Sequence, residues 1–228
     1  MIRALLIDID NTILDFDAYV REAMKTGFAK FGIGEYREEM FPIFTRINLS
    51  LWRRIEQGTL TFEELQKIRW NRVFEGLGFT FDGPTFERYF RSMLNENAIP
   101  VEGAHETLAY LQTRYVLGAA SNAPYRQQIG RLQLAGMKRY FRHFFLSERI
   151  GASKPDPAFF DACMRGLREE MPDLQPDEVM MIGDSLTSDV GGGQAYGMQC
   201  CYFDREGKHN APPGCPSVTK LEQLRELL

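Results

Sequence analysis

Two aspartates spaced two residues apart follow an apolar run at the start of the chain. Residues 4–10 read as a buried strand, and Asp8 and Asp10 stand at its end. Because alternate residues of a strand point to the same side, we expect both carboxylates to face one site beyond the strand, where open α/β sheets bind ligands. Neighbouring carboxylates repel each other unless a cation neutralises them, and Mg2+ prefers oxygen ligands. The pair predicts a divalent metal site that leaves one carboxylate oxygen free to attack, although a solvated turn fits the same pattern.

Two groups suited to anions follow later in the chain. The apolar run 116–120 ends in Ser121 and Asn122, a hydroxyl and an amide that suit phosphate oxygens. Lys154 precedes two prolines that favour the start of a helix, so we expect it on a loop with its ammonium free to meet an anion. Taken singly, each group also fits an ordinary strand end or a solvated lysine.

A third apolar run, 179–182, leads to further acids. Asp184 stands at the tip of this expected strand, and Asp189 follows about one helical turn later. A strand end followed by a helix cap would look the same. The order of all four groups along the chain is therefore more informative than any one of them.

These four groups in this order resemble the haloacid dehalogenase-like hydrolase superfamily, whose members are mostly Mg-dependent phosphatases. The resemblance makes Asp8 the nucleophile that forms an aspartyl-phosphate, and Asp10 the general acid and base. It also implies that Ser121 and Lys154 hold the phosphoryl oxygens, with Asn122 supporting that cradle or the first substrate atoms beyond it.

The same resemblance implies the ligands of Mg2+. They would be the Asp8 carboxylate, the Asp10 backbone carbonyl and Asp184, with Asp189 reaching the metal through water or orienting Lys154. Members of the superfamily that remove halide lack an acid at the position of Asp10 and need no metal. Dehalogenation is therefore disfavoured for this chain.

About a hundred residues separate the first strand from the second, far more than a crossover between parallel strands needs. We expect a helical insert over 15–95, and the resemblance implies that it is a C1-type cap over a catalytic core of residues 1–14 and 96–228. From residue 101 onward helices and strands alternate, which predicts a Rossmann-like, doubly wound parallel sheet with helices on both faces. The expected helices are 18–31, 61–77, 86–94, 106–114, 125–135, 158–167, 186–196 and 221–227, and the expected strands are 4–10, 116–121, 144–146, 179–184 and 200–203.

Stretches 8–16, 48–58 and 183–190 look like the bacterial pyrimidine or nucleoside 5′-monophosphatase subfamily, the house-cleaning nucleotidases. This resemblance implies nucleoside 5′-monophosphates as substrates, with Phe16 and Trp52 as candidates for selecting the leaving group. Four alternatives stay open: a phosphatase of small sugar or glycolate phosphates, a phosphomutase, a haloacid dehalogenase and a non-catalytic binding module.

Composition limits the partners of the chain. A net charge of −4 and the absence of a basic run argue against nucleic acid, and the apolar stretches are too short to span a membrane. The start of the chain lacks a small-residue cleavage site, so we expect no removable signal peptide. Adjacent Cys200 and Cys201 suit buried thiols, which favours a reducing cytoplasm. We expect a small phosphate ester as partner, and either a monomer or a homodimer.

Overall fold

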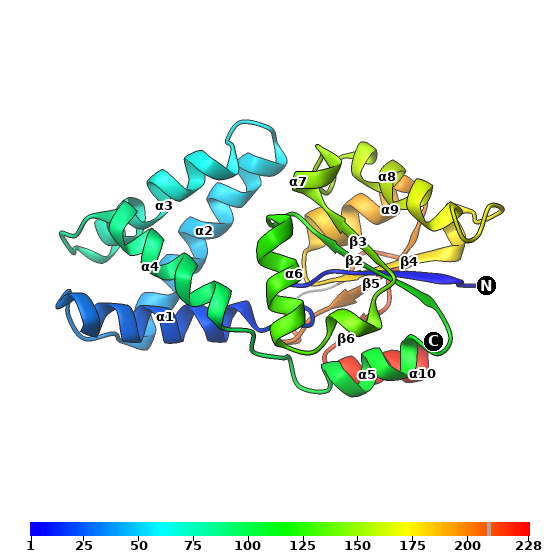
Figure 1. Ribbon diagram of the computed structural model, residues 1–228, viewed down its shortest axis with the longest axis horizontal. Helices are drawn as coiled ribbons and strands as arrows, with labels where there is room; N and C mark the ends of the chain where they lie inside the picture. The colour runs from blue at the N-terminus through cyan, green and yellow to red at the C-terminus, as the bar shows by residue number, and fades with distance from the viewer. Residues whose placement is uncertain (209–210) are drawn as a thin grey trace. The chain divides into compact units, whose positions relative to one another are not determined.

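The computed structural model describes residues 1–208 and 211–228, which form two compact units (Figure 1). One unit combines residues 1–15 with 98–228 and contains the sheet. The other, residues 16–97, is helical. The chain thus leaves the first unit soon after its first strand and returns to it about eighty residues later.

A six-stranded parallel sheet organises the first unit. Its strand order is β3-β2-β1-β4-β5-β6, so the chain winds outward from β1 in both directions, and the expected doubly wound sheet is confirmed. Ile7 at the end of β1 pairs with Ala119 of β2 and Ile182 of β4, which places the residues after these strands at one edge. The strands are β1 (Ala4–Ile7), β2 (Val116–Ser121), β3 (His143–Leu146), β4 (Val179–Gly183), β5 (Gln199–Phe203) and β6 (Ser217–Val218).

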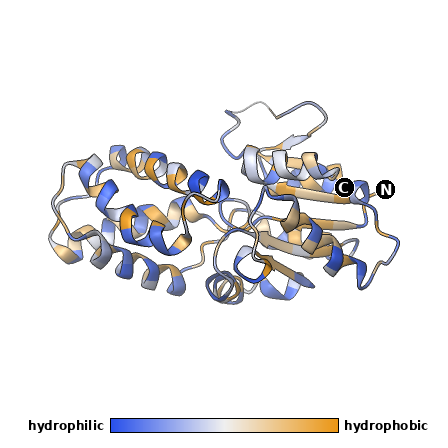
Figure 2. Cartoon of the chain, turned by 90° about the horizontal axis from the view of Figure 1, so that it is seen from above, coloured by the Kyte–Doolittle hydropathy of each residue, from blue (hydrophilic) through white to orange (hydrophobic). Residues whose placement is uncertain are grey.

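Helices cover both faces of the sheet (Figure 1). Leu5 and Ile7 of β1 pack into a core with α5, α6 and α10, whereas Ala4 and Leu6 pack into a second core with α8. Because both faces are covered, β1 is apolar throughout rather than alternating. The strands of the sheet are mostly hydrophobic in colour (Figure 2). The helices of this unit are α5 (Ala104–Leu111), α6 (Tyr125–Leu134), α7 (Ser147–Ile150), α8 (Pro157–Arg168), α9 (Gly192–Tyr196) and α10 (Leu224–Leu227).

Several element boundaries differ from the sequence expectation. The first strand ends at Ile7 rather than Asp10, because the Ile9 carbonyl then accepts three backbone N–H groups in a turn. The single helix expected over 186–196 is a π-helical turn, Leu186–Gly191, followed by α9. The last helix begins as a 3₁₀ turn, Leu221–Gln223, and the two-residue strand β6 was too short to be recognised.

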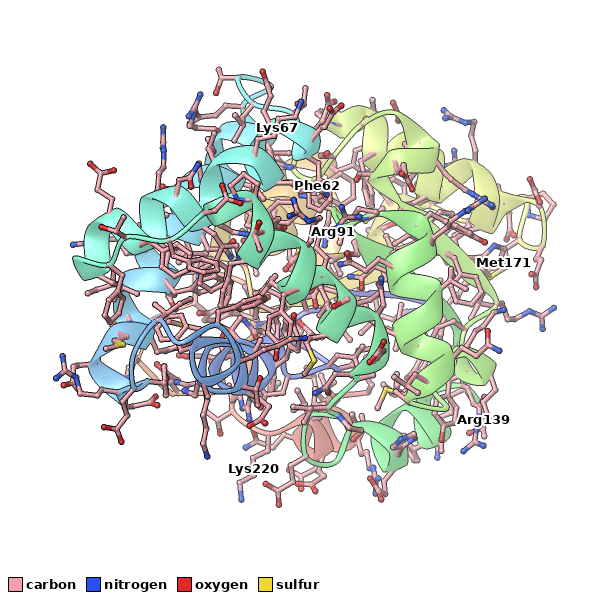
Figure 3. All side chains as sticks on the ribbon, turned by 60° about the vertical axis from the view of Figure 1, so that its left-hand side comes forward. Phe62, Lys67, Arg91, Arg139, Met171 and Lys220 are labelled. Carbon is pink, nitrogen blue, oxygen red and sulfur yellow. The ribbon has the colours of Figure 1, made fainter. Side chains whose placement is uncertain are left out.

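The second unit packs four helices around an aromatic core. They are α1 (Phe16–Phe31), α2 (Phe41–Glu56), α3 (Phe62–Leu77) and α4 (Gly83–Glu96). Thr61 and Glu64 form the expected capping box at the start of α3. Trp70 and Phe86 bring their ring centroids to 4.2 Å at the centre, while Lys67 lies at the surface of α3 (Figure 3).

The described helices include none that is long and apolar enough to cross a membrane.

Candidate active site

Three carboxylates meet at the carboxyl edge of the sheet. Asp8, Asp184 and Asp189 each offer an oxygen that lies within 4.8 Å of the other two. Asp8 directly follows β1, and Asp184 directly follows β4, which is paired with β1 in register. Asp8 and Asp189 are buried and Asp184 is partly exposed. The parallel register thus brings together acids that are far apart in the sequence.

A buried lysine holds two of these acids. Lys154 donates from Nζ to Asp8 Oδ1 at 2.8 Å, to Asp189 Oδ1 at 2.6 Å and to the Ala120 carbonyl at 2.8 Å. All three of its protons are therefore used. Lys154 lies on a loop before α8, as expected, but its ammonium is not free, because the loop folds inward and the buried ammonium is paired with two carboxylates.

Asn122 fixes the loop that carries this lysine. Its side-chain Nδ2 donates to the Lys154 carbonyl at 2.9 Å, and its Oδ1 accepts from the Lys154 backbone N–H at 2.8 Å. Ser147 in turn donates from Oγ to the Asn122 carbonyl at 2.8 Å. The Asn122 amide is thus engaged in supporting the loop.

Burial and charge oppose each other in this cluster. Burial raises the pKa of Asp8 to about 7; the Lys154 ammonium opposes the rise and the Asp189 carboxylate adds to it. Burial tends to lower the pKa of Lys154, but Asp189 and Asp8 more than offset this, so its pKa is raised. The lysine stays charged and Asp8 ionises at a cost, which a further cation would reduce.

The π-helical turn and Gly183 place Asp189. The Ser185 carbonyl accepts from the backbone N–H groups of both Asp189 and Val190, at 3.2 and 3.1 Å, and Ser185 N–H donates to Asp189 Oδ2 at 3.0 Å. A Cβ at Gly183 would lie 2.1 Å from that oxygen. Asp189 can therefore adopt this position only because residue 183 has no side chain. Its contact with Lys154 corresponds to one of the two expectations for Asp189, namely that it orients this lysine.

Asp10 has separate partners. Its carboxylate is not among the three grouped acids; it forms an ion pair with Arg131 Nη1, and its Oδ2 accepts from Gln128 Nε2 at 2.6 Å. Gln128 Nε2 also donates to Ser121 Oγ at 2.9 Å. The sequence analysis missed Gln128 and Arg131, whose only signal is their spacing of three on one face of an expected helix.

Thr12 also escaped the sequence analysis. It is fully buried and donates from Oγ1 to Asp8 Oδ2 at 3.3 Å. Its position two residues after Asp10 was its only signal. Both oxygens of Asp8 are thus held, one by Lys154 and one by Thr12.

Phe16 and Trp52 lie in the helical unit. Phe16 packs against Tyr19 and Phe90, and Trp52 packs against Phe62, with ring centroids between 5.7 and 6.3 Å apart. Both side chains are partly exposed. A role for either in selecting substrate stays a prediction.

The grouped acids fit a hard divalent cation. They offer only carboxylate oxygens, and three carboxylates against one ammonium leave a formal charge of −2 when all are ionised. Mg2+ prefers such ligands, whereas zinc prefers nitrogen and sulfur. The donor set and its charge therefore suit Mg2+.

Comparison with known proteins finds a matching family and several similar hydrolases. A model of haloacid dehalogenase-like hydrolases matches residues 2–197. The HAD-hydrolase YfnB of Bacillus subtilis is 32% identical over 99% of this chain and 95% of its own, and its magnesium-bound crystal structure gives a TM-score of 0.88 over 100% and 98% of the two chains. Two pyrimidine 5′-nucleotidases are also similar: PynA of Streptococcus pneumoniae, 30% identical over 93% of this chain and 88% of its own, and YjjG of Escherichia coli, 26% identical over 98% and 96%.

Proposed function

Because this chain belongs to the haloacid dehalogenase-like hydrolase family, we propose that it is a Mg2+-dependent phosphatase of nucleoside 5′-monophosphates. The separation of its two leading acids carries the proposal. Asp8 lies in a group of three carboxylates, two of which pair with Lys154, whereas Asp10 is paired with Arg131 outside that group. A covalent phosphatase needs two such environments, because one carboxylate attacks phosphorus while another exchanges a proton with the leaving group.

The reaction would proceed in two steps. Asp8 attacks the phosphorus and forms an aspartyl-phosphate, while the ester oxygen departs with a proton from Asp10. Asp10 then takes a proton from the water that attacks the aspartyl-phosphate, which releases inorganic phosphate and restores both acids.

Ser121 and Lys154 would hold the phosphoryl oxygens during both steps. Lys154 uses its three protons within the protein, so it would exchange one of those contacts for a phosphate oxygen. Mg2+ bound by Asp8, the Asp10 carbonyl and Asp184 would offset the charge that phosphoryl transfer spreads over the phosphate oxygens. Asp189 would keep Lys154 in place.

Two findings support nucleotides over other phosphate esters. PynA and YjjG, which are similar along nearly their whole lengths, are described as pyrimidine 5′-nucleotidases. The helical unit also contains partly exposed aromatic side chains, Phe16 and Trp52, that could stack on a base. Among the alternatives, a dehalogenase would need neither Asp10 nor the metal.

Initial rates across a panel of substrates test the proposal. The panel contains purine and pyrimidine nucleoside 5′-monophosphates in ribo and deoxy forms, nucleoside triphosphates, sugar phosphates, phosphoglycolate and a 2-haloacid, each with Mg2+ or with chelator. We expect the highest kcat/KM for pyrimidine and deoxy monophosphates, little turnover of triphosphates and none with chelator. A sugar phosphate or phosphoglycolate that exceeds every nucleotide tenfold, about 1.4 kcal/mol of transition-state discrimination, would refute the nucleotidase assignment but keep the phosphatase.

Variants of the helical unit extend this test. Phe16→Ala and Trp52→Ala should narrow the differences in kcat/KM among leaving groups. The control is p-nitrophenyl phosphate, whose ring is not a nucleobase. Equal losses on every ester would exclude these residues as determinants of specificity.

A further inference from the structure

One buried face of α6 presents two polar side chains to the candidate active site. Gln128 and Arg131 are three residues apart in this helix and project from the same face. Both are buried, Arg131 to 1% exposure, and both contact the Asp10 carboxylate. A buried amide and a buried guanidinium are costly unless they are paired. Their contacts with Asp10 are thus built into the core.

Arg131 determines which way the Gln128 amide points. Arg131 Nη1 donates to Gln128 Oε1 at 3.0 Å, so the amide oxygen faces the guanidinium. A flipped amide would turn its own protons toward the guanidinium protons. The Nε2 group of Gln128 is thereby left to donate one proton to Asp10 Oδ2 and one to Ser121 Oγ, at 2.6 and 2.9 Å.

This second donation determines how Ser121 can bind a ligand. Ser121 Oγ accepts from Gln128 Nε2 and, at 3.2 Å, from the Ala123 backbone N–H. A hydroxyl has two lone pairs and one proton, so these two contacts leave the proton for donation. The oxygens of a phosphoryl group are acceptors. Gln128 therefore prepares Ser121 as a donor to phosphate.

The same pair fixes Asp10. Arg131 holds Oδ1 and Gln128 holds Oδ2, which determines the plane of the carboxylate. Each carboxylate oxygen has a second lone pair, which can carry the proton that Asp10 exchanges with the leaving group or with water. The carboxylate can therefore work without leaving these partners.

We propose that Gln128 and Arg131 are positioning residues that tie the phosphate-binding hydroxyl of Ser121 to the acid and base Asp10. This inference rests on the proposed function, and it adds a structural link between phosphate binding by Ser121 and proton transfer by Asp10. Gln128 acts on both Ser121 and Asp10, whereas Arg131 acts on Asp10 directly and on Ser121 only through the amide of Gln128.

Phosphate affinity tests the contact with Ser121. Gln128→Met keeps the length of the side chain but removes both donors. We expect the dissociation constant of inorganic phosphate, measured by calorimetry with Mg2+ present, to rise about three- to tenfold, the range for one hydrogen bond. The control is Gln133→Met, an exposed glutamine on the same helix, which should leave phosphate affinity unchanged.

Leaving-group dependence tests the contact with Asp10. p-Nitrophenol leaves readily without a proton, whereas a nucleoside 5′-hydroxyl or a simple alcohol needs one. The fold-decrease in kcat caused by Arg131→Met should therefore be about ten times larger on alkyl phosphates than on p-nitrophenyl phosphate. Asp10→Asn should show the same trend. Arg131→Lys, which keeps the charge, should recover part of this loss, and the double variant of Arg131 and Asp10 should show less than the product of the two losses.

Two results would overturn the proposal: equal losses on good and poor leaving groups in the Arg131 variants, or unchanged phosphate affinity in Gln128→Met. Circular dichroism and melting temperature identify variants that fail to fold, and Arg131→Lys then serves in place of Arg131→Met. Arg165→Met, an exposed arginine of α8, is the matched surface control. If the wild-type protein neither hydrolyses phosphate esters nor binds phosphate, the proposed function itself is refuted. Failure of the proposed function is thus distinguished from failure of the positioning role of Gln128 and Arg131.

Discussion

Replacing Asp8 by Asn should abolish turnover and yet stabilise the metal-free protein. An amide cannot form the acyl-phosphate, so catalysis should stop. The substituted side chain can keep its partners, because Asn Oδ1 can accept from Lys154 Nζ and Asn Nδ2 can donate to Thr12 Oγ1 after that hydroxyl turns. The change therefore removes a buried charge while the Lys154 ammonium and the Thr12 hydroxyl each keep a partner at residue 8.

The gain in stability should depend on pH. Burial raises the pKa of Asp8 from its ordinary value of 3.8 to about 7, and each pKa unit corresponds to about 1.4 kcal/mol. The folded protein thus binds a proton more tightly than the unfolded chain, so ionising Asp8 costs stability. That cost is small below pH 3.8, grows through the interval to pH 7 and is complete above it. It amounts to about 1 kcal/mol at about pH 4.5 and about 4 kcal/mol at about pH 8.

Urea unfolding with chelator present measures this difference. The four cysteines are buried and belong to the unit that contains Asp8, so their reaction with a disulfide reagent reports the unfolding of that unit. Both tryptophans lie in the helical unit, and their fluorescence follows it separately. The advantage of Asp8→Asn in the cysteine signal should grow by about 3 kcal/mol from pH 4.5 to pH 8.

Two controls and one outcome complete this test. The exposed substitution Asp177→Asn should change the unfolding free energy by no more than about 0.5 kcal/mol. Mg2+ should stabilise the wild type through binding and should do so less for Asp8→Asn, which narrows the difference. The difference in unfolding free energy between Asp8→Asn and the wild type should grow with pH. If it is the same at both pH values, or shrinks as pH rises, Asp8 is not a buried charge that costs stability.

Two further predictions concern the rest of the acid group. Asp184→Ala should weaken Mg2+ binding more than Asp189→Ala does, because Asp184 is the proposed direct ligand. The rate of turnover as a function of Mg2+ concentration measures this, and equal midpoints for the two variants would refute the order. Gly183→Ala should displace the Asp189 carboxylate, whose oxygen lies 2.1 Å from the added Cβ, and should lower kcat at least tenfold while costing about 1–3 kcal/mol of stability. Gly130→Ala is the control, because nothing lies within 4 Å of the added Cβ and an alanine in a helix should be neutral or stabilising. Similar losses of kcat and stability in both variants would show that displacement of Asp189 is not their cause.

The layout of the fold was predictable because its signals are local. Strands buried on both faces are continuous apolar runs, as in β1, and the capping box of Thr61 and Glu64 is formed by residues three apart. The end of the first strand was not predictable in the same way. Asp8 and Asp10 continue the two-residue spacing of a strand, whereas the turn that stops it depends on hydrogen bonds to the Ile9 carbonyl.

The partners of the site residues were harder to predict because they come from distant parts of the chain. Lys154 reads as a surface lysine until Asp8, 146 residues away, and Asp189, 35 residues away, are placed beside it. Arg131 lies 121 residues from Asp10, and its helix carries other polar residues that are exposed. Residue type and spacing identify the strand ends that contribute chemistry, but only the packed fold shows which acid receives which cation.

That allocation of cations explains how two acids so close in sequence can differ in role. Asp8 shares Lys154 with Asp189, so its charge is balanced within a group that still has excess negative charge and attracts a further cation. Asp10 pairs instead with Arg131, and its side chain is 28% exposed, so its charge affects the pKa of Asp8 less than Lys154 and Asp189 do. The turn after β1 sends the two carboxylates to different partners. Separate partners suit a covalent phosphatase, because a nucleophile and a proton carrier that shared one cation would each shift the pKa of the other whenever either changed its charge.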